Sequence, residues 1–234
     1  MYYCMNAEGT EYTIPSTVTS LTPYTFAYNA NLTTLTILEG VEEIPCAFAQ
    51  SALALTTINI PNTVKNICGT LPTSESQWGN VYKWGAIGAF YGCAALVDVN
   101  FAPDVQVESL PAWSFYDIGC TAFTVPASLK TIEANALFGM QLESINAAVS
   151  ETASFTSLDG VLYTKDMSTL VKYPNAKTDE EFTLPDGVTT IGKYAIHANF
   201  FLTKVTLSQN VTTIEEGGFA FCKKEVCMYR ILAN

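Results

Sequence analysis

The sequence predicts an α/β repeat protein, a right-handed solenoid whose coils each add one strand to a parallel β-sheet. Three observations predict this fold. Aliphatic anchor residues recur every 23 residues, as at Ile14, Ile37 and Ile60, and again at Leu184 and Leu207. Apolar and polar residues alternate just before these anchors, as expected of strands with one buried face. Proline often follows the anchor directly, where it ends the strand.

The rest of each coil follows from the same repeat. A second aliphatic residue lies seven positions after most anchors, at Leu21, Ile44, Ile67, Ile132, Ile191 and Ile214. Segments such as "GAFYGC" and "KYAIHAN" predict short helical turns on the outer side, too short to be stable alone. Stacking lets each coil cover its neighbour, so we expect about seven coils with right-handed crossovers.

We expect a single domain over residues 1–234, with insertions at about 69–86 and 147–181. The second insertion resembles a hairpin, and its Tyr163 and Tyr173 are expected in the hairpin core. The parallel strands are predicted to stack in one sheet, at about residues 34–38, 57–60, 97–101, 122–125, 143–146 and 203–207.

A small residue lies three positions after the aromatic or aliphatic residue of the outer turn. Such a residue can bond the buried amides where the chain turns back into the strand, and we expect it to form a structural ladder. The ladder residues are Asn29, Ser51, Cys93, Asn199 and Cys222. Cys93 and Cys222 are therefore predicted to be buried, reduced and unreactive, in preference to reactive thiols.

At this level of detail the sequence resembles the BspA-like, or Treponema-type, leucine-rich repeat proteins. The resemblance depends on "TTINIPNTVKNI", "IGAFYGCAAL", "FTLPDGVTTIGKYAI" and "LTKVTLSQNVTTIEEGGFAFC", and on the hairpin "FTSLDGVLYTKDMSTLVKYPNAK". It implies a leucine-rich-repeat solenoid that is secreted or located at the cell surface of a gut or oral bacterium or a mucosal protozoan. It also implies adhesion to host proteins or to other cells.

Composition excludes several classes of protein. Hydrophobic residues make up 49% of the chain and charged residues 14%, which provides for a packed core. Acids outnumber bases 22 to 11, so nucleic acids and anionic membrane surfaces are not expected partners. No apolar run is long enough to span a membrane, and we expect a soluble chain that lacks an export signal. The seven unevenly spaced cysteines argue against a full disulfide framework.

Two surfaces are candidates for ligand binding. The first insertion carries Trp78, Tyr82 and Trp84, which either anchor an interface and stack on sugars or cover the solenoid edge. The second candidate is a polar column between the strand aliphatics, which either binds a ligand or only bonds internally. Its members are Thr13, Thr36, Asn59, Asn100, Thr124, Asn146, Thr183 and Thr206; we select Asn59, Asn100, Thr124, Asn146 and Thr206 as ligand-binding residues.

Catalytic and metal sites are not predicted, and no cofactor is expected. The single histidine, His197, is expected to be a solvated surface residue. Cys222 and Cys227 lack a second Cys/His pair nearby, so a zinc site is improbable. The sequence thus predicts a non-catalytic, extracellular binding module for a host or cell-surface protein. The alternative is a glycan-binding or enzyme-associated accessory module that uses the loop 69–86.

Overall fold

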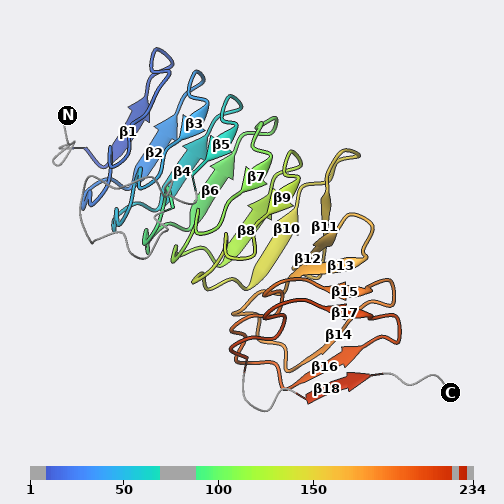
Figure 1. The fold of residues 1–234 in the computed structure, drawn as a ribbon. Coiled ribbons are helices and arrows are strands. Elements are labelled where there is room, and N and C mark those ends of the chain that lie inside the picture. Colours follow the sequence, from blue (N-terminus) through green and yellow to red (C-terminus); the bar gives the residue numbers. More distant parts are fainter. Residues whose placement is uncertain (1–8, 69–87, 223–226, 231–234) are drawn as a thin grey trace, which may run out of the picture. The chain divides into compact units, whose positions relative to one another are not determined.

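The computed structural model describes residues 9–68 and 88–222, and the backbone of 227–230. Its strands form about eight turns of a parallel-sheet β-solenoid, near the seven predicted. The chain divides into two compact units: residues 1–120 with 128–140 form unit 1, and residues 121–127 with 141–234 form unit 2. Each unit has its own ladders of strands (Figure 1). The prediction of one domain with insertions at 69–86 and 147–181 stays a prediction.

Unit 1 contains one ladder built from the first strand of each coil. Its order is β1-β2-β4-β6, and all pairs are parallel. The strands are β1 (Glu11–Ile14), β2 (Thr34–Ile37), β4 (Thr57–Ile60) and β6 (Asp98–Phe101). Alternation of buried and partly exposed residues is clearest in β2 and β4, because their aliphatic side chains enter the core while threonine and asparagine face outward.

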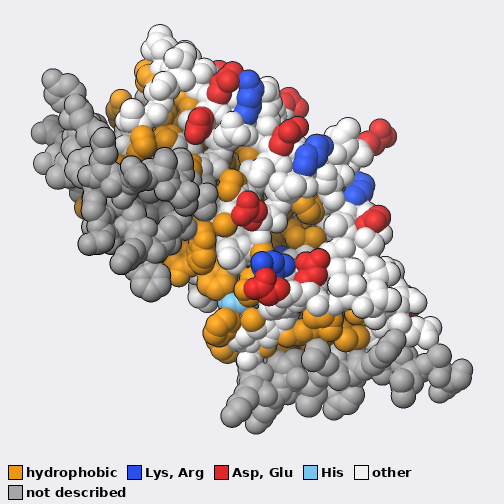
Figure 2. Space-filling model, viewed as in Figure 1, with side chains coloured by type: hydrophobic (Ala, Val, Ile, Leu, Met, Phe, Trp, Pro, Cys, Tyr) orange, Lys and Arg blue, Asp and Glu red, His pale blue; other side chains and the backbone are white. Residues whose placement is uncertain are grey.

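The second strands of unit 1 are only two residues long, and they form a row separate from the first strands. The parallel pairs are β3 (Glu43–Ile44) with β5 (Asn66–Ile67), and β7 (Ser109–Leu110) with β9 (Thr131–Ile132). Acidic and basic side chains are interspersed along this row (Figure 2), where Lys65 pairs with Glu42 at 2.8 Å. The repeat resumes after the first insertion next to the point where it stopped, since Ala89 N donates to Cys68 O at 3.0 Å.

Unit 2 contains two further ladders of first strands. They consist of β8 (Ala122–Val125) with β10 (Ser144–Ala147), and of β14 (Glu181–Thr183), β16 (Lys204–Leu207) and β18 (Cys227–Arg230). The predicted hairpin is present as β12 (Val161–Thr164) and β13 (Thr169–Lys172), which pair antiparallel. β11 (Phe155–Leu158) precedes it and pairs antiparallel with β12. β13 then pairs in parallel with β15 (Thr190–Ile191), and β15 with β17 (Thr213–Ile214).

The predicted strands are confirmed in position and in their parallel pairing, but the expectation of a single sheet is wrong. In unit 2 the turn between β11 and β12 lies beside β10: Ile145 N donates to Gly160 O at 2.7 Å. A Cβ atom on Gly160 would lie 3.0 Å from Ser144 Cβ. The insertion therefore occupies the edge of β10 at which the strand of the next coil would pair, and the ladder restarts at β14.

The predicted helical turns are absent from the described residues, and this prediction is wrong. N–H groups of the outer turn donate to the next coil instead of to residue i−4: Phe26 N bonds Phe48 O, and Tyr28 N bonds Gln50 O, both at 2.8 Å. Left-handed residues four positions apart interrupt any helix, with φ of 52–67°. They are Tyr24 and Tyr28, Ala47 and Ser51, Trp113 and Asp117, Tyr194 and Ala198, and Gly217 and Phe221.

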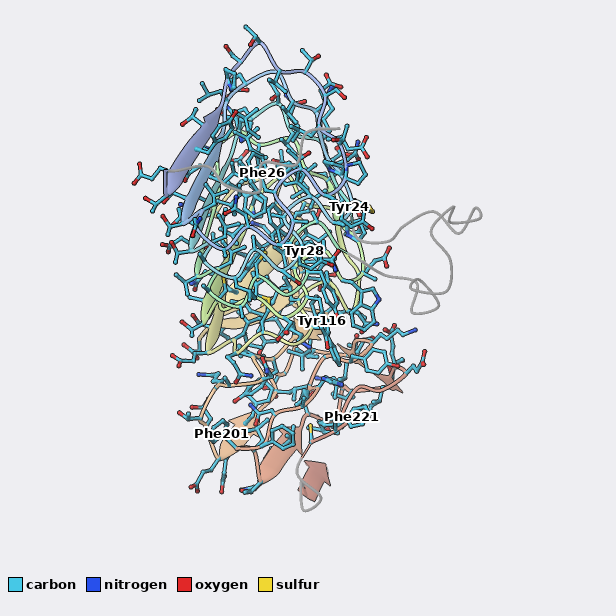
Figure 3. The ribbon with its side chains drawn as sticks, turned by 90° about the vertical axis from the view of Figure 1, so that its left-hand side faces the viewer. Tyr24, Phe26, Tyr28, Tyr116, Phe201 and Phe221 are labelled. Atoms are coloured by element: carbon cyan, nitrogen blue, oxygen red, sulfur yellow. A yellow bond between two sulfur atoms is a disulfide. The ribbon has the colours of Figure 1, made fainter. Side chains whose placement is uncertain are left out.

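The core of unit 1 is closed by a row of phenylalanines between the sheet and the outer turns. Phe26, Phe48, Phe90 and Phe115 come from successive coils, with ring centroids 5.3–6.4 Å apart. Figure 3 shows Phe26 inside the coil, with Tyr24 and Tyr116 on the side away from the sheet of unit 1. In unit 2, Tyr163 and Tyr173 are fully buried, and both belong to a cluster with Leu170, Ile191 and Val205. Among the described residues, no helix could cross a membrane.

Candidate functional site

A groove lies at the carboxyl ends of three neighbouring strands of unit 1. Three consecutive residues at the end of each of β2, β4 and β6, some within the strand and some just after it, line the groove, and its free volume is about 280 Å³. The lining residues are Ile37, Leu38, Glu39, Asn59, Ile60, Pro61, Asn100, Phe101 and Ala102. Two residues of the predicted polar column, Asn59 and Asn100, are therefore part of one concave surface.

The polar column forms a hydrogen-bonded chain along this ladder. Thr36, Asn59 and Asn100 lie in register on β2, β4 and β6. Asn100 Nδ2 donates to Asn59 Oδ1 at 3.0 Å, and Asn59 Nδ2 donates to Thr36 Oγ1 at 2.9 Å. Since every amide donates in the same direction, the chain begins at Asn100 and its side-chain oxygen is left as the terminal acceptor. Among the described residues, no hydrogen bond to that oxygen occurs.

The floor of the groove is apolar. Ile37 and Ile60 are each only 2% exposed, because they complete the core below the strand ends. Phe101 replaces the aliphatic anchor in the fourth coil; it is half-buried and packs edge-on against Phe115, with centroids 6.4 Å apart. Leu38 is 41% exposed at a position where the next coils have Pro61 and Ala102. An exposed leucine beside buried isoleucines gives the groove apolar surface that faces solvent.

The rim of the groove carries carboxylates. Glu39 accepts hydrogen bonds from the backbone N–H of Asn62 (3.3 Å) and of Thr63 (3.1 Å) in the next coil. Asn62 Oδ1 in turn accepts from Asp104 N at 3.2 Å, and Asp104 lies two residues beyond the lining residue Ala102. Glu39 and Asp104 are both exposed. These bonds hold the rim to the backbone and leave acceptor capacity on the carboxylates.

The other predicted column residues lie in unit 2. Asn146 is in register with Thr124 on β10 and β8, and Thr206 is in register with Thr183 on β16 and β14. They continue the column within their own ladders, so the predicted set is spread over three ladders. Their assignment as ligand-binding residues stays a prediction. Trp78, Tyr82 and Trp84 lie outside the described residues.

The ladder residues satisfy backbone groups at the turn into the strand. Asn199 Oδ1 accepts from Phe201 N and Leu202 N, both at 2.9 Å, and Asn29 Oδ1 accepts from Asn31 N and Leu32 N. Two thiols also donate to carbonyl oxygens of the preceding coil: Cys93 Sγ to Ala49 O and Cys222 Sγ to Ile196 O, both at 2.9 Å.

The thiols of this ladder differ in exposure. Cys93 is fully buried, as predicted, and burial raises its pKa to about 12. The prediction of burial is wrong for Cys222, which is only partly buried next to the exposed Phe221; burial still raises the pKa of its thiol. Ser51 differs from the other ladder residues. It has a φ of 53°. The next residue, Ala52, lies at the turn into the strand instead: its N–H donates to Ala49 O, and its carbonyl oxygen accepts from Leu55 N.

Sequence reasoning missed three features. Cys46 and Cys68 form a disulfide between successive coils, and their spacing of 22 residues was a usable signal. Outer-turn aromatics in unit 1 stack in a row: the rings of Tyr91 and Tyr116 are 4.8 Å apart, and those of Tyr116 and Phe138 are 6.0 Å apart. Hydrophobic side chains are visible on the turn side of the molecule (Figure 2).

The third feature corrects the prediction that His197 is a solvated residue. His197 is only 6% exposed and packs between the rings of Tyr194 and Phe221, at 5.7 and 5.2 Å. Burial, and then the charge of Lys172, lower its pKa to about 4. Lys172 is itself buried, donates to Tyr194 O at 3.2 Å, and has its pKa lowered to about 8 by burial. Among the described residues, no group of three or more His, Cys, Asp or Glu side chains could hold a metal ion.

Comparison with known proteins agrees with this architecture. The model of the BspA type leucine rich repeat region matches six copies, over residues 1–71, 86–163 and 173–228. The fold is similar to the pneumococcal vaccine antigen PcpA, with a TM-score of 0.65 and 20% identity over 91% of this chain and 58% of that one. It is also similar to a leucine rich cell surface protein of Faecalibacterium prausnitzii A2-165, with a TM-score of 0.59 and 21% identity over 93% of this chain and 62% of that one.

A leucine-rich repeat protein of Eubacterium ventriosum ATCC 27560 gives a TM-score of 0.58 and 20% identity, over 95% of this chain and 62% of that one. The chain thus spans less than two thirds of the length of these structures. No curated protein matches the sequence. Because the family model covers most of the sequence, the chain belongs to the BspA-type leucine-rich repeat family.

Proposed function

We propose that the chain is a non-catalytic protein-binding module that works outside the cell, with adhesion as its broad role. The groove at the ends of β2, β4 and β6 is the observation that carries this proposal. It combines exposed apolar surface at its centre with an amide that has a spare acceptor and the exposed carboxylate of Glu39 at its rim, and an apolar centre with a polar rim is typical of protein-binding surfaces. Solenoids offer such surfaces because each coil adds one row of side chains to the same face.

Two further observations support an extracellular location. The Cys46–Cys68 disulfide joins adjacent coils, and structural disulfides persist in oxidising compartments. One of the similar structures is described as a cell surface protein. The strongly acidic composition, with 22 acids against 11 bases, favours partners that carry basic surfaces.

The test is a binding screen of the purified chain against immobilised extracellular-matrix proteins and a glycan array. We expect protein hits whose affinity falls about tenfold or more when Asn100→Leu fills the groove, as at an interface hot spot. Asn66→Leu is the matched control, because Asn66 is an exposed asparagine on β5, in the row of second strands of unit 1, and does not line the groove. Protein hits that both variants bind equally well would contradict the groove as the binding surface.

The alternative is a glycan-binding module that uses Trp78, Tyr82 and Trp84. One observation favours it: Ala89, after the first insertion, bonds to Cys68, before it. The repeat therefore continues across an insertion that contains three large aromatic residues. In that case the glycan array gives the hits, and the double substitution Trp78→Ala and Trp84→Ala weakens binding by about 2 kcal/mol with little change in melting temperature. A large fall in melting temperature with unchanged affinity would assign these residues to a structural cover.

A further inference from the structure

We infer that the groove of unit 1 binds an arginine side chain of the partner protein. The apolar stem of that arginine would lie over Ile60 and Phe101, and its guanidinium group would meet Asn100 and the carboxylates of the rim. This inference rests on the proposed function, because it names the chemical group that the same groove recognises.

The direction of the amide chain is the first step. Asn100 and Asn59 both donate toward β2, so their Nδ2 hydrogens are partly used within the ladder. The oxygen of Asn100 is then an acceptor that the ladder does not use, beside one remaining N–H on each amide. A ligand donor such as an arginine N–H can bond that oxygen, which a carboxylate cannot.

The charge of the rim is the second step. Glu39 lines the groove, and Asp104 is linked to it through Asn62. The basic side chains among the described residues of unit 1 are Lys65 and Lys130. Lys65 forms its ion pair with Glu42 on the row of second strands, at 2.8 Å. Neither of these two lysines lines the groove. A cation from a partner would therefore meet carboxylates whose charge these lysines do not neutralise.

The shape of the groove is the third step. Its free volume of about 280 Å³ is below the range of about 300–1,000 Å³ that encloses a drug-sized ligand, so one long side chain is the fitting occupant. Six of the nine lining residues are apolar: Ile37, Leu38, Ile60, Pro61, Phe101 and Ala102. Arginine buries three methylene groups against such a surface while its charged end stays at the rim.

Arginine fits these features better than lysine. The acceptors come from two coils that β4 separates: the carboxylate of Glu39 after β2, and on the other side the oxygen of Asn100 on β6 and the carboxylate of Asp104 after β6. A planar guanidinium has five N–H donors and can reach several acceptors at once, whereas an ammonium is a compact, strongly hydrated charge.

The test uses the full chain, isotope-labelled for NMR, and four short peptides of the form acetyl-Gly-Gly-Xaa-Gly-Gly-amide. The central residue is arginine, citrulline, lysine or glutamate; citrulline has the shape of arginine without its charge. We expect the arginine peptide to shift the side-chain amide signals of Asn59 and Asn100 in a saturable way. The citrulline and lysine peptides should bind about fivefold or more weakly, and the glutamate peptide should cause no shift.

Charge-removing variants complete the test. Glu39→Gln and Asp104→Asn should each weaken arginine-peptide binding at least about threefold. Glu42→Gln is the matched control: Glu42 is an exposed glutamate of the same unit, paired with Lys65 away from the groove, and its variant should bind as the parent does. The inference is overturned if citrulline or lysine binds as tightly as arginine, or if the amides of Asn59 and Asn100 do not shift.

The failure of this inference can be told apart from a failure of the proposed function. A protein ligand that is lost with Asn100→Leu but unaffected by Glu39→Gln and Asp104→Asn would overturn arginine recognition and leave the protein-binding role in place. Saturable arginine-peptide binding in a chain that captures no protein in the screen would support arginine recognition and count against the proposed function.

Discussion

Asn199 shows how a single side chain fixes the turn between two coils. It is fully buried and makes four hydrogen bonds: its oxygen accepts from Phe201 N and Leu202 N, and its nitrogen donates to Pro174 O and Lys177 O. All four partners are backbone groups at the turn into a strand. The side chain thus replaces the hydrogen bonds that a helix or strand would supply there.

The first prediction concerns this residue. Asn199→Ala leaves buried backbone groups without partners and should lower the free energy of unfolding by about 3 kcal/mol. Asn210→Ala is the control, because Asn210 is exposed and its side chain donates one hydrogen bond, to Asp186 O; its cost should stay below about 1 kcal/mol. Urea unfolding followed by circular dichroism measures both. Equal costs for the two variants would show that Asn199 has no special role.

The second prediction concerns the pH dependence of stability through His197. Its pKa is lowered to about 4 in the folded chain, by burial first and then by the charge of Lys172, whereas an unfolded histidine titrates near 6.5. The unfolded state therefore binds more protons between these values, so this contribution to stability is full above pH 6.5 and is lost as the pH falls toward 4.

His197 is the single histidine of the chain, which makes the test direct. The melting temperature of the parent should fall between pH 6.5 and pH 4.5, and the fall should be smaller in His197→Gln, which cannot titrate in that range. Carboxylates titrate in both proteins and cancel in the comparison. Identical pH profiles for the two proteins would mean that His197 is solvated, as the sequence alone indicated.

At the scale of elements, the link between the second and third coils depends on a disulfide. Cys46 and Cys68 have Cα atoms 4.8 Å apart and are separated by 22 residues, about one coil of the repeat. Closing a loop of this size in the unfolded chain is expected to stabilise the fold by about 3 kcal/mol. The bond lies at the end of β5, directly before the first insertion.

The third prediction tests this link. Replacing both cysteines (Cys46→Ser and Cys68→Ser) should lower the free energy of unfolding by about 3 kcal/mol, whereas a reducing agent should destabilise the parent and leave the double variant unchanged. Peptide mapping of the unreduced protein should recover the two cysteines in one cross-linked product. Alkylation of both in the unreduced, denatured chain would contradict the bond.

Gly119 lies where two adjacent coils stack closely. A Cβ atom on Gly119 would overlap Ala94 O in the preceding coil, and the overlap could be relieved only by a shift of the backbone. On Gly187 the nearest such atom, Met167 O, is 3.7 Å away, an ordinary contact. The coils therefore approach so closely at Gly119 that no other side chain fits.

The fourth prediction follows from that difference. Gly119→Ala should lower the free energy of unfolding by about 1–3 kcal/mol through overpacking. Gly187→Ala should change it by no more than about 0.5 kcal/mol. Thermal melts of the two single variants beside the parent measure the difference. A neutral Gly119→Ala would show that adjacent coils are not in contact at this turn.

At the scale of the whole molecule, the repeat determined most of the fold in advance. The 23-residue step and the strand alternation located β2, β4, β6, β8, β10 and β16, because a parallel ladder requires equivalent residues at equal spacing. The outer turns were mispredicted as helical, since their N–H groups bond the next coil and no single coil contains that information. The interruption of the sheet depends on where Gly160 meets β10, which spacing alone does not reveal.

The candidate site was predictable only in part. Alternation placed Asn59 and Asn100 on the outward face of their strands, and the structure brings them into one groove. The groove also needs the exposed Leu38, the carboxylate of Glu39 and the small Ala102, which lie after the strand ends, where the repeat pattern is loose. The stacked Tyr91, Tyr116 and Phe138 recur at about one coil of spacing, a signal that was present and could have been used.

Hydrogen exchange tests most directly whether the strand ends of unit 1 are the binding surface. The exchange of the chain alone is compared with that of the chain bound to its strongest protein hit from the screen. We predict slower exchange on binding at residues 36–39, 59–63 and 100–104, which form the groove and its rim. Protection confined to the outer turns, or to residues 69–86, with unchanged exchange at these strand ends would contradict the account.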